Sequence, residues 1–279
     1  MLNLLMGDTR SKAEDVCPWV IQPHLTVSSG ILFPRMKESV QDVIDRARSS
    51  PSSSSSIPRS LAYRWTRQIA HALSYLEARG YYHGDLKPSN LLLDSHHNAI
   101  LSDFGSAGPL GTYLRTSSNL YTTGWGKGGA GSESYAFGWT VWDIWNGGHD
   151  ARLDEMDEGA EEEVAFPTGK EIEGVMGKGM ARVVARCWKR EWGSVRELKE
   201  AVDGVYEAGQ TVEGRTEDER DEAAARAEKP AERCEVLRQE MRSVCVELGI
   251  EKGCRKMDVA KRNRSDSAIG MMECGYDSD

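Results

Sequence analysis

Two short stretches of this sequence decide its fold. The first reads Tyr82-His83-Gly84-Asp85-Leu86-Lys87-Pro88-Ser89-Asn90, and the second reads Asp103-Phe104-Gly105. Between them, the apolar runs 91–93 and 99–101 flank a polar segment. Short apolar runs around a polar turn predict a β-hairpin. One strand would follow Asn90 and the other would deliver Asp103, so we expect Asp85 and Asp103 to converge at one end of the hairpin.

The two stretches resemble the catalytic loop and the magnesium loop of the eukaryotic protein kinases of the serine/threonine type. Asp85 and Asn90 fit D-x-x-x-x-N, and Asp103 opens D-F-G. The resemblance implies that Asp85 takes the proton of an acceptor hydroxyl and that Lys87 neutralises the phosphate in flight. Asn90 and Asp103 would supply the oxygen ligands that Mg²⁺ prefers, with ATP as the second cofactor. The alternative is that both aspartates are solvated turn residues.

The resemblance implies an α+β, protein-kinase-like fold with a mainly α-helical large lobe and an incomplete β small lobe. Residues 1–45 would be a remnant of the small lobe and hinge, because the family's glycine-rich loop and strand lysine are missing. Residues 46–60 would be a Ser-rich disordered insertion and a candidate for phosphorylation. The large catalytic lobe would span 61–208, and 209–279 would form a charged, partly helical or disordered tail.

Apolar residues at helical spacing from Leu61 to Leu76 predict a helix, with Ser60 and Gly80 as its capping residues. The run Tyr135–Trp145 looks like the buried central helix of the large lobe, with Glu133 where the family has Asp. A later helix would contain Cys187-Trp188, and Val195–Val202 suits the final one.

Upstream, residues 19–21 and 30–33 predict two strands around a polar turn. By the resemblance, Phe33 would lie at the back of the nucleotide pocket and Met36 would be the hinge residue that offers backbone groups to adenine. Leu92 would be the apolar floor beneath the base.

The sequence departs from the family pattern in two places. Gly84 replaces the Arg that normally pairs with a phosphorylated activation-segment residue, so we expect activity that phosphorylation of this segment does not switch. The family's Ala-Pro-Glu triplet does not occur between Gly105 and Glu133. The Glu of that triplet normally forms a buried ion pair with an Arg, and Val195 stands about where this Arg would be. Losing both partners of a buried ion pair is nearly neutral.

Other motifs in this region are expected to be structural. His83 and Phe104 are expected to pack as core residues that link the two loops. The run Gly126-Lys127-Gly128-Gly129-Ala130-Gly131 fits G-x-G-x-x-G, but the strand that a phosphate loop requires does not precede it. We interpret it as a flexible part of the activation segment.

The composition of the 279 residues bounds the partners. With 39% hydrophobic residues the chain can bury a core, and no apolar run reaches membrane-spanning length. A net charge of −9 argues against nucleic-acid binding. Six scattered cysteines without a C-x-x-C pair favour a reducing, cytoplasmic location. The basic cluster 261–264 is either a nuclear-localisation signal or a solvated surface patch.

Three interpretations of function remain open. The first is a kinase that phosphorylates Ser or Thr of protein substrates, and the second is a pseudokinase scaffold that acts by protein–protein binding. The third is a fragment of a longer kinase. In the tail, an apolar helical stripe is either a site for a protein partner or a helix packed on its own domain; it consists of Cys234, Leu237, Met241, Val244 and Leu248.

Overall fold

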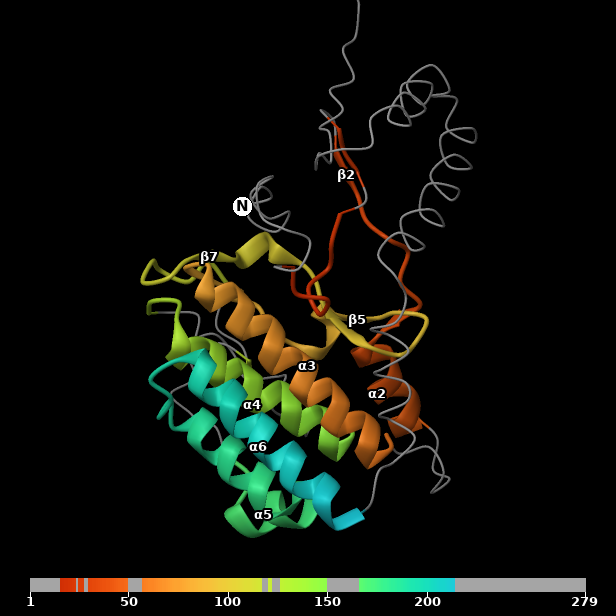
Figure 1. Ribbon diagram of the computed structural model, residues 1–279, viewed down its shortest axis with the longest axis vertical. Coiled ribbons are helices and arrows are strands. Elements are labelled where there is room, and N and C mark those ends of the chain that lie inside the picture. Colours follow the sequence, from red (N-terminus) through yellow and green to blue (C-terminus); the bar gives the residue numbers. More distant parts are fainter. Residues whose placement is uncertain are drawn as a thin grey trace, which may run out of the picture.

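The computed structural model describes residues 16–23, 25–27, 30–49, 57–116, 120–121, 126–149 and 166–213. The helices gather into one body, and the short strands lie at one end of it (Figure 1). The described helices are α2 (Val40–Ser49), α3 (Arg59–Ala78), α4 (Ala130–Asn146), α5 (Gly169–Trp188) and α6 (Val195–Glu213). The fold is α+β and kinase-like, with a mainly helical large lobe.

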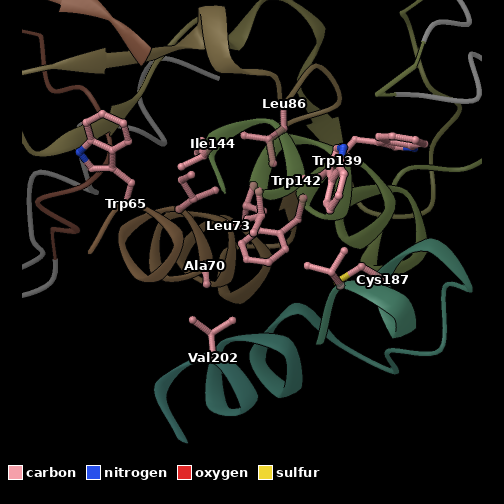
Figure 2. Packing of buried hydrophobic residues seen from close by; sticks show 14 of the residues in the cluster. Trp65, Ala70, Leu73, Leu86, Trp139, Trp142, Ile144, Cys187 and Val202 are labelled. Carbon is pink, nitrogen blue, oxygen red and sulfur yellow. The ribbon is translucent and has the colours of Figure 1, made fainter. Parts of the chain in front are cut away.

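Helix α4 is the centre of the helical body. It contacts α3, α5 and α6, and its side chains from Glu133 to Ile144 are buried. A helix that is apolar on all sides is buried on all sides, so the predicted central helix is confirmed. In Figure 2, Val202 of α6 points toward Ala70 of α3, and Trp139 and Trp142 of α4 lie on the side of the cluster nearer to Leu86 and Cys187.

Helix α3 confirms the prediction of a helix over 61–76, but Ser60 does not cap it. The helix begins at Arg59, after Pro58, which makes no side-chain cap. Proline lacks an N–H, so it suits a helix start, and its carbonyl accepts the Ala62 N–H at 3.0 Å. Gly80 closes the helix as predicted, with a left-handed backbone (φ +81°) and its N–H donated to Glu77 at 2.8 Å.

Polar contacts join α3 to α6. The Glu77 carboxylate accepts the N–H groups of Val195 (2.7 Å) and Arg196 (3.0 Å), so it satisfies the first turn of α6. About two turns further along α6, Asp203 pairs with Arg67 at 2.8 Å and with His71 at 2.9 Å. Val195 itself is buried, so an apolar side chain lies about where the resemblance to the kinases predicts an Arg.

The predicted hairpin over 91–101 is confirmed. Strands β5 (Leu91–Leu93) and β6 (Ala99–Leu101) are antiparallel, with Leu92 opposite Ile100. The Asp94 carboxylate holds the turn by accepting the N–H groups of His96 and Asn98. Strand β3 (Glu38–Ser39) pairs with the other edge of β5, which gives the order β3-β5-β6.

The upstream strands differ from the prediction. Residues 19–21 form no hairpin with 30–33; instead Val20 bridges in parallel to Leu101 of β6, where the Ile21 N–H donates to the Leu101 carbonyl at 2.9 Å. The hairpin consists of β1 (Leu25–Val27) and β2 (Gly30–Leu32). A single parallel bridge to a residue far along the chain leaves no local pattern, and this is why the sequence misplaced the strand.

Two predicted boundaries also move. Residues 46–49, assigned to the Ser-rich insertion, are the last turn of α2. This helix begins with a capping box, because the Ser39 N–H donates to the Asp42 carboxylate and the Asp42 N–H donates to the Ser39 hydroxyl. Helix α6 continues past 208 to Glu213. Residues 50–56, the tail stripe and the basic cluster 261–264 lie outside the described residues, and no described helix could cross a membrane.

Glycine is required where α4 meets α5. A Cβ at Gly138 would lie 2.9 Å from the Trp188 ring and 3.0 Å from Cys187 Cβ. Gly138→Ala is therefore expected to overpack the core and lower the free energy of unfolding by about 1–3 kcal/mol, as measured by urea denaturation. Gly204→Ala is the matched control: nothing lies within 4 Å of its added methyl, so it should be neutral or stabilise α6. Equal losses in both variants would contradict the described packing.

Candidate active site

The structure brings Asp85, Lys87 and Asn90 together in one loop. This loop follows strand β4 (Tyr81–Tyr82) and ends in the short 3₁₀ helix η2 (Pro88–Asn90). Lys87 Nζ lies 3.0 Å from Asp85 Oδ2. The Asn90 amide donates to the Asp85 carbonyl at 2.7 Å and to its Oδ2 at 3.0 Å. The carboxylate is therefore fixed by a cation on one side and an amide on the other.

Hydrogen bonds join this loop to the one that carries Asp103. The N–H and the hydroxyl of Ser102 both donate to the Asn90 carbonyl, at 2.9 and 2.8 Å. Asp103 is the next residue, and its exposed carboxylate accepts the Gly105 N–H at 3.2 Å. Its backbone is left-handed (φ +56°), which is uncommon for a residue other than glycine and typical of functional sites. The two loops adjoin, as the hairpin predicted.

The oxygen atoms of Asn90 and Asp103 suit a hard cation. The NH₂ of the Asn90 amide is used by Asp85, so its Oδ1 is the atom that can face a cation. Within the described ranges, no group of three or more His, Cys, Asp or Glu could hold a metal ion. Mg²⁺ commonly takes one or two protein oxygens and completes its shell with water and phosphate, and this pair fits that requirement.

His83 is a structural residue beneath the loops, as expected. Its ring is fully buried, its Nε2 donates to the Ser102 carbonyl at 2.8 Å, and its Nδ1 accepts the Asp85 N–H at 3.3 Å. Burial lowers the pKa of His83, so the ring is neutral and these two bonds fix its tautomer. The ring meets Phe104 edge to face at 5.1 Å. The expected link between the two loops is confirmed.

Glu133, in the first turn of α4, has a larger role than its position in the sequence indicated. Its side chain is buried, Oε2 accepts the His83 N–H at 2.9 Å, and Oε1 accepts the Gly84 N–H at 3.0 Å. Burial raises the pKa of Glu133 to about 7, against the lowering effect of these two bonds. The sequence showed that an acid begins the helix, but only the tertiary structure shows what it holds.

The residues assigned to the nucleotide lie on and before two strands of the three-stranded sheet: Leu92 is on the middle strand β5, and Met36 precedes the edge strand β3. Met36 is half-buried in the turn before β3, where the next residue, Lys37, donates its N–H to the Leu93 carbonyl at 3.0 Å. Leu92 is half-buried and faces away from its buried neighbours Leu91 and Leu93. The structure tests neither role. Phe33 is 42% exposed, which does not fit a residue at the back of a pocket.

The glycine-rich run does not form a phosphate loop. Residues 126–128 pair with residues 111–114: the Gly128 N–H donates to the Thr112 carbonyl at 2.8 Å, and Tyr113 bridges to Lys127. Gly129 then caps α4. The interpretation of this run as a flexible segment is therefore corrected for residues 126–128, which are held by backbone hydrogen bonds.

The pKa of Glu133 gives a testable pH dependence. Its value of about 7 in the folded chain lies above the ordinary 4.5, so burial favours the protonated form. The contribution of Glu133 to stability is then full below about pH 4.5 and is lost as the pH rises through about 7. In Glu133→Gln this titration is absent. The difference in unfolding free energy between wild type and variant should fall between about pH 5 and pH 7 and be level above; a constant difference would contradict the assignment.

Comparison with known proteins agrees with this geometry. Residues 31–127, about a third of the chain, match the model of the protein kinase domain. CBL-interacting serine/threonine-protein kinase 3 of Arabidopsis thaliana is 47% identical over 62 residues, which is 22% of this chain and 14% of that protein. The serine/threonine-protein kinase grp of Drosophila melanogaster is 51% identical over 51 residues, 18% of this chain and 10% of that protein. The chain thus spans only a small part of the length of these relatives.

The matched residues include both loops described above and the strands that carry them. The helical body and the paired loops agree with this match, which makes residues 31–127 similar to the protein kinase domain.

Proposed function

We propose that this chain transfers the γ-phosphoryl group of ATP to Ser or Thr hydroxyls of protein substrates. The observation that carries the proposal is the single hydrogen-bonded assembly of Asp85, Lys87 and Asn90, joined through Ser102 to Asp103. Two relatives that match part of this chain are named as serine/threonine-protein kinases, which supports the class of acceptor. The net charge of −9 favours cationic protein substrates over nucleic acid.

Asp85 is the base in this proposal. A carboxylate that is held in place by the Asn90 amide can orient an acceptor hydroxyl and take its proton as the phosphorus–oxygen bond forms. Lys87 Nζ, 3.0 Å from Asp85 Oδ2, forms an ion pair that helps to hold the carboxylate in place. The same ammonium can offset negative charge that develops on the transferred group.

Asn90 and Asp103 would hold Mg²⁺, which supplies charge neutralisation to the phosphates when it is bound. Asn90 then has two tasks, since its NH₂ orients the base while its Oδ1 faces the cation. Asp103 contributes an exposed carboxylate on a backbone conformation that the Gly105 N–H stabilises. Met36, before β3, would offer backbone groups to adenine, and Leu92, on β5, would contact the base.

The test is phosphoryl transfer from labelled Mg-ATP to a generic basic protein. Asp85→Asn removes the proton acceptor and keeps the shape of the side chain, so the rate should fall by about 10²–10⁴-fold. Asp45→Asn is the control, because Asp45 is an exposed carboxylate that accepts a hydrogen bond from Gln41 of its own helix α2. Transfer that survives in Asp85→Asn would contradict the assignment of the base. No transfer by a folded, monodisperse wild type would favour the catalytically inactive scaffold.

A further inference from the structure

We infer that Tyr82 is a positioning residue that holds the catalytic loop and the activation segment together without a phosphate. The activation segment here means the described residues 106–116, 120–121 and 126–129, between Asp103-Phe104-Gly105 and α4. The inference rests on the proposed function only in assuming that this segment faces the substrate. It concerns how the segment is ordered, and that can be measured without any phosphoryl transfer.

Tyr82 is fully buried where β4 pairs with β7 (Gly108–Pro109), directly opposite Gly108. Its hydroxyl donates to the Tyr113 carbonyl at 2.8 Å and accepts from the Thr112 hydroxyl at 3.3 Å. The ring therefore contacts the start of the activation segment, and its polar end binds the segment further along. Two residues beyond Tyr82 in the chain is Gly84, and the next is Asp85, the proposed base.

Three glycines from three separate segments close on the Tyr82 side chain. A Cβ would lie 2.9 Å from the ring at Gly84, 2.7 Å from the hydroxyl oxygen at Gly108 and only 2.1 Å from the ring at Gly128. Distances under 3.0 Å are not tolerated without movement of one partner. Any side chain at these positions would push the ring, the catalytic loop or the activation segment out of place.

The ring and the glycines also fix the backbone pairing in the segment. Gly128 accepts the Gly111 N–H at 2.9 Å and donates to the Thr112 carbonyl at 2.8 Å, and the Leu114 N–H donates to the Gly126 carbonyl at 3.0 Å. All three bonds lie beside the Tyr82 hydroxyl and its Tyr113 partner. Their amide hydrogens therefore report whether the segment is held.

A second attachment fixes a later part of the segment. The Tyr121 hydroxyl donates to Asp143 Oδ2 on α4, and His149 Nδ1 lies 2.9 Å from the same oxygen. Asp143 is almost fully buried. The segment is thus bound to the large lobe at both Tyr82 and Tyr121 by side chains that carry no phosphate.

Gly84 explains why a phosphate is not needed. A long cation at this position is what would bind a phosphorylated residue of the segment. Gly84 has a left-handed backbone (φ +80°), and a Cβ there would lie 2.8 Å from the Ser106 carbonyl. The close packing against Tyr82 therefore takes the place of the pair between an Arg and a phosphate, and it acts together with the hydrogen bonds of the Tyr82 hydroxyl and the backbone.

Hydrogen–deuterium exchange on phosphatase-treated protein tests this inference. In wild type, the amides of Gly111, Leu114 and Gly128 should be protected, and phosphatase treatment should not change their exchange. Gly128→Ala should raise exchange at Gly111 and Leu114 by about tenfold or more, because a tenfold change corresponds to about 1.4 kcal/mol of opening free energy. Gly129→Ala is the matched control: nothing lies within 4 Å of its methyl, so exchange should change by less than about twofold.

Two further variants separate positioning from general stability. Tyr82→Phe keeps the ring and removes only the hydroxyl, so the fold should persist while exchange at Leu114 rises. The double variant Tyr82→Leu with Gly128→Ala gives the added methyl room, so the two changes together should cost less than the sum of the single changes. Where transfer is measurable, Gly128→Ala should raise KM for the protein substrate more than KM for ATP.

Equal exchange in Gly128→Ala and Gly129→Ala would overturn the inference. So would additive effects in the double variant, or protection of the segment that appears only after phosphorylation.

Discussion

The buried carboxylate of Glu133 is the interaction on which the rest of the site depends. It accepts the backbone N–H groups of His83 and Gly84, so it ties the catalytic loop to the first turn of the central helix. Buried N–H groups without acceptors are costly, and the Glu133 side chain supplies an acceptor to each of these two. Because α4 is packed on α3, α5 and α6, the loop takes its position from the whole helical body.

Starting from Glu133, a series of hydrogen bonds connects buried residues to the exposed Asp103. His83 links the catalytic loop to Ser102, and Ser102 links Asn90 to Asp103. Asp85 and Lys87 are half-buried, Asn90 is buried and Asp103 is exposed. His83 and Ser102, which take no part in the proposed reaction, hold the backbone of the loops that carry these groups. Tyr82 acts on the other side of the loop, where close contact with glycines replaces hydrogen bonding to a charge.

The sequence predicts those elements of the fold that depend on local residue patterns. The hairpin over 91–101, the central helix and the closure of α3 at Gly80 each follow from spacing, composition or a special backbone residue. It misplaced the upstream strand, because Val20 pairs with β6 far along the chain. It also missed α2, because the last turn of this helix runs into a serine tract that dominates the local composition. The sequence predicts a flexible run at Gly128, because no local pattern shows that the Tyr82 ring packs against this residue.

The most direct test is a crystal structure of the chain with Mg²⁺ and a non-hydrolysable ATP analogue. The account predicts a Mg²⁺ ion bound by Asn90 Oδ1 and the Asp103 carboxylate, with the terminal phosphate beside Lys87 and the Asp85 carboxylate facing an open position for a hydroxyl. The Glu133 bonds to His83 and Gly84 should be unchanged. A nucleotide bound elsewhere, or a cation that touches neither Asn90 nor Asp103, would contradict the account.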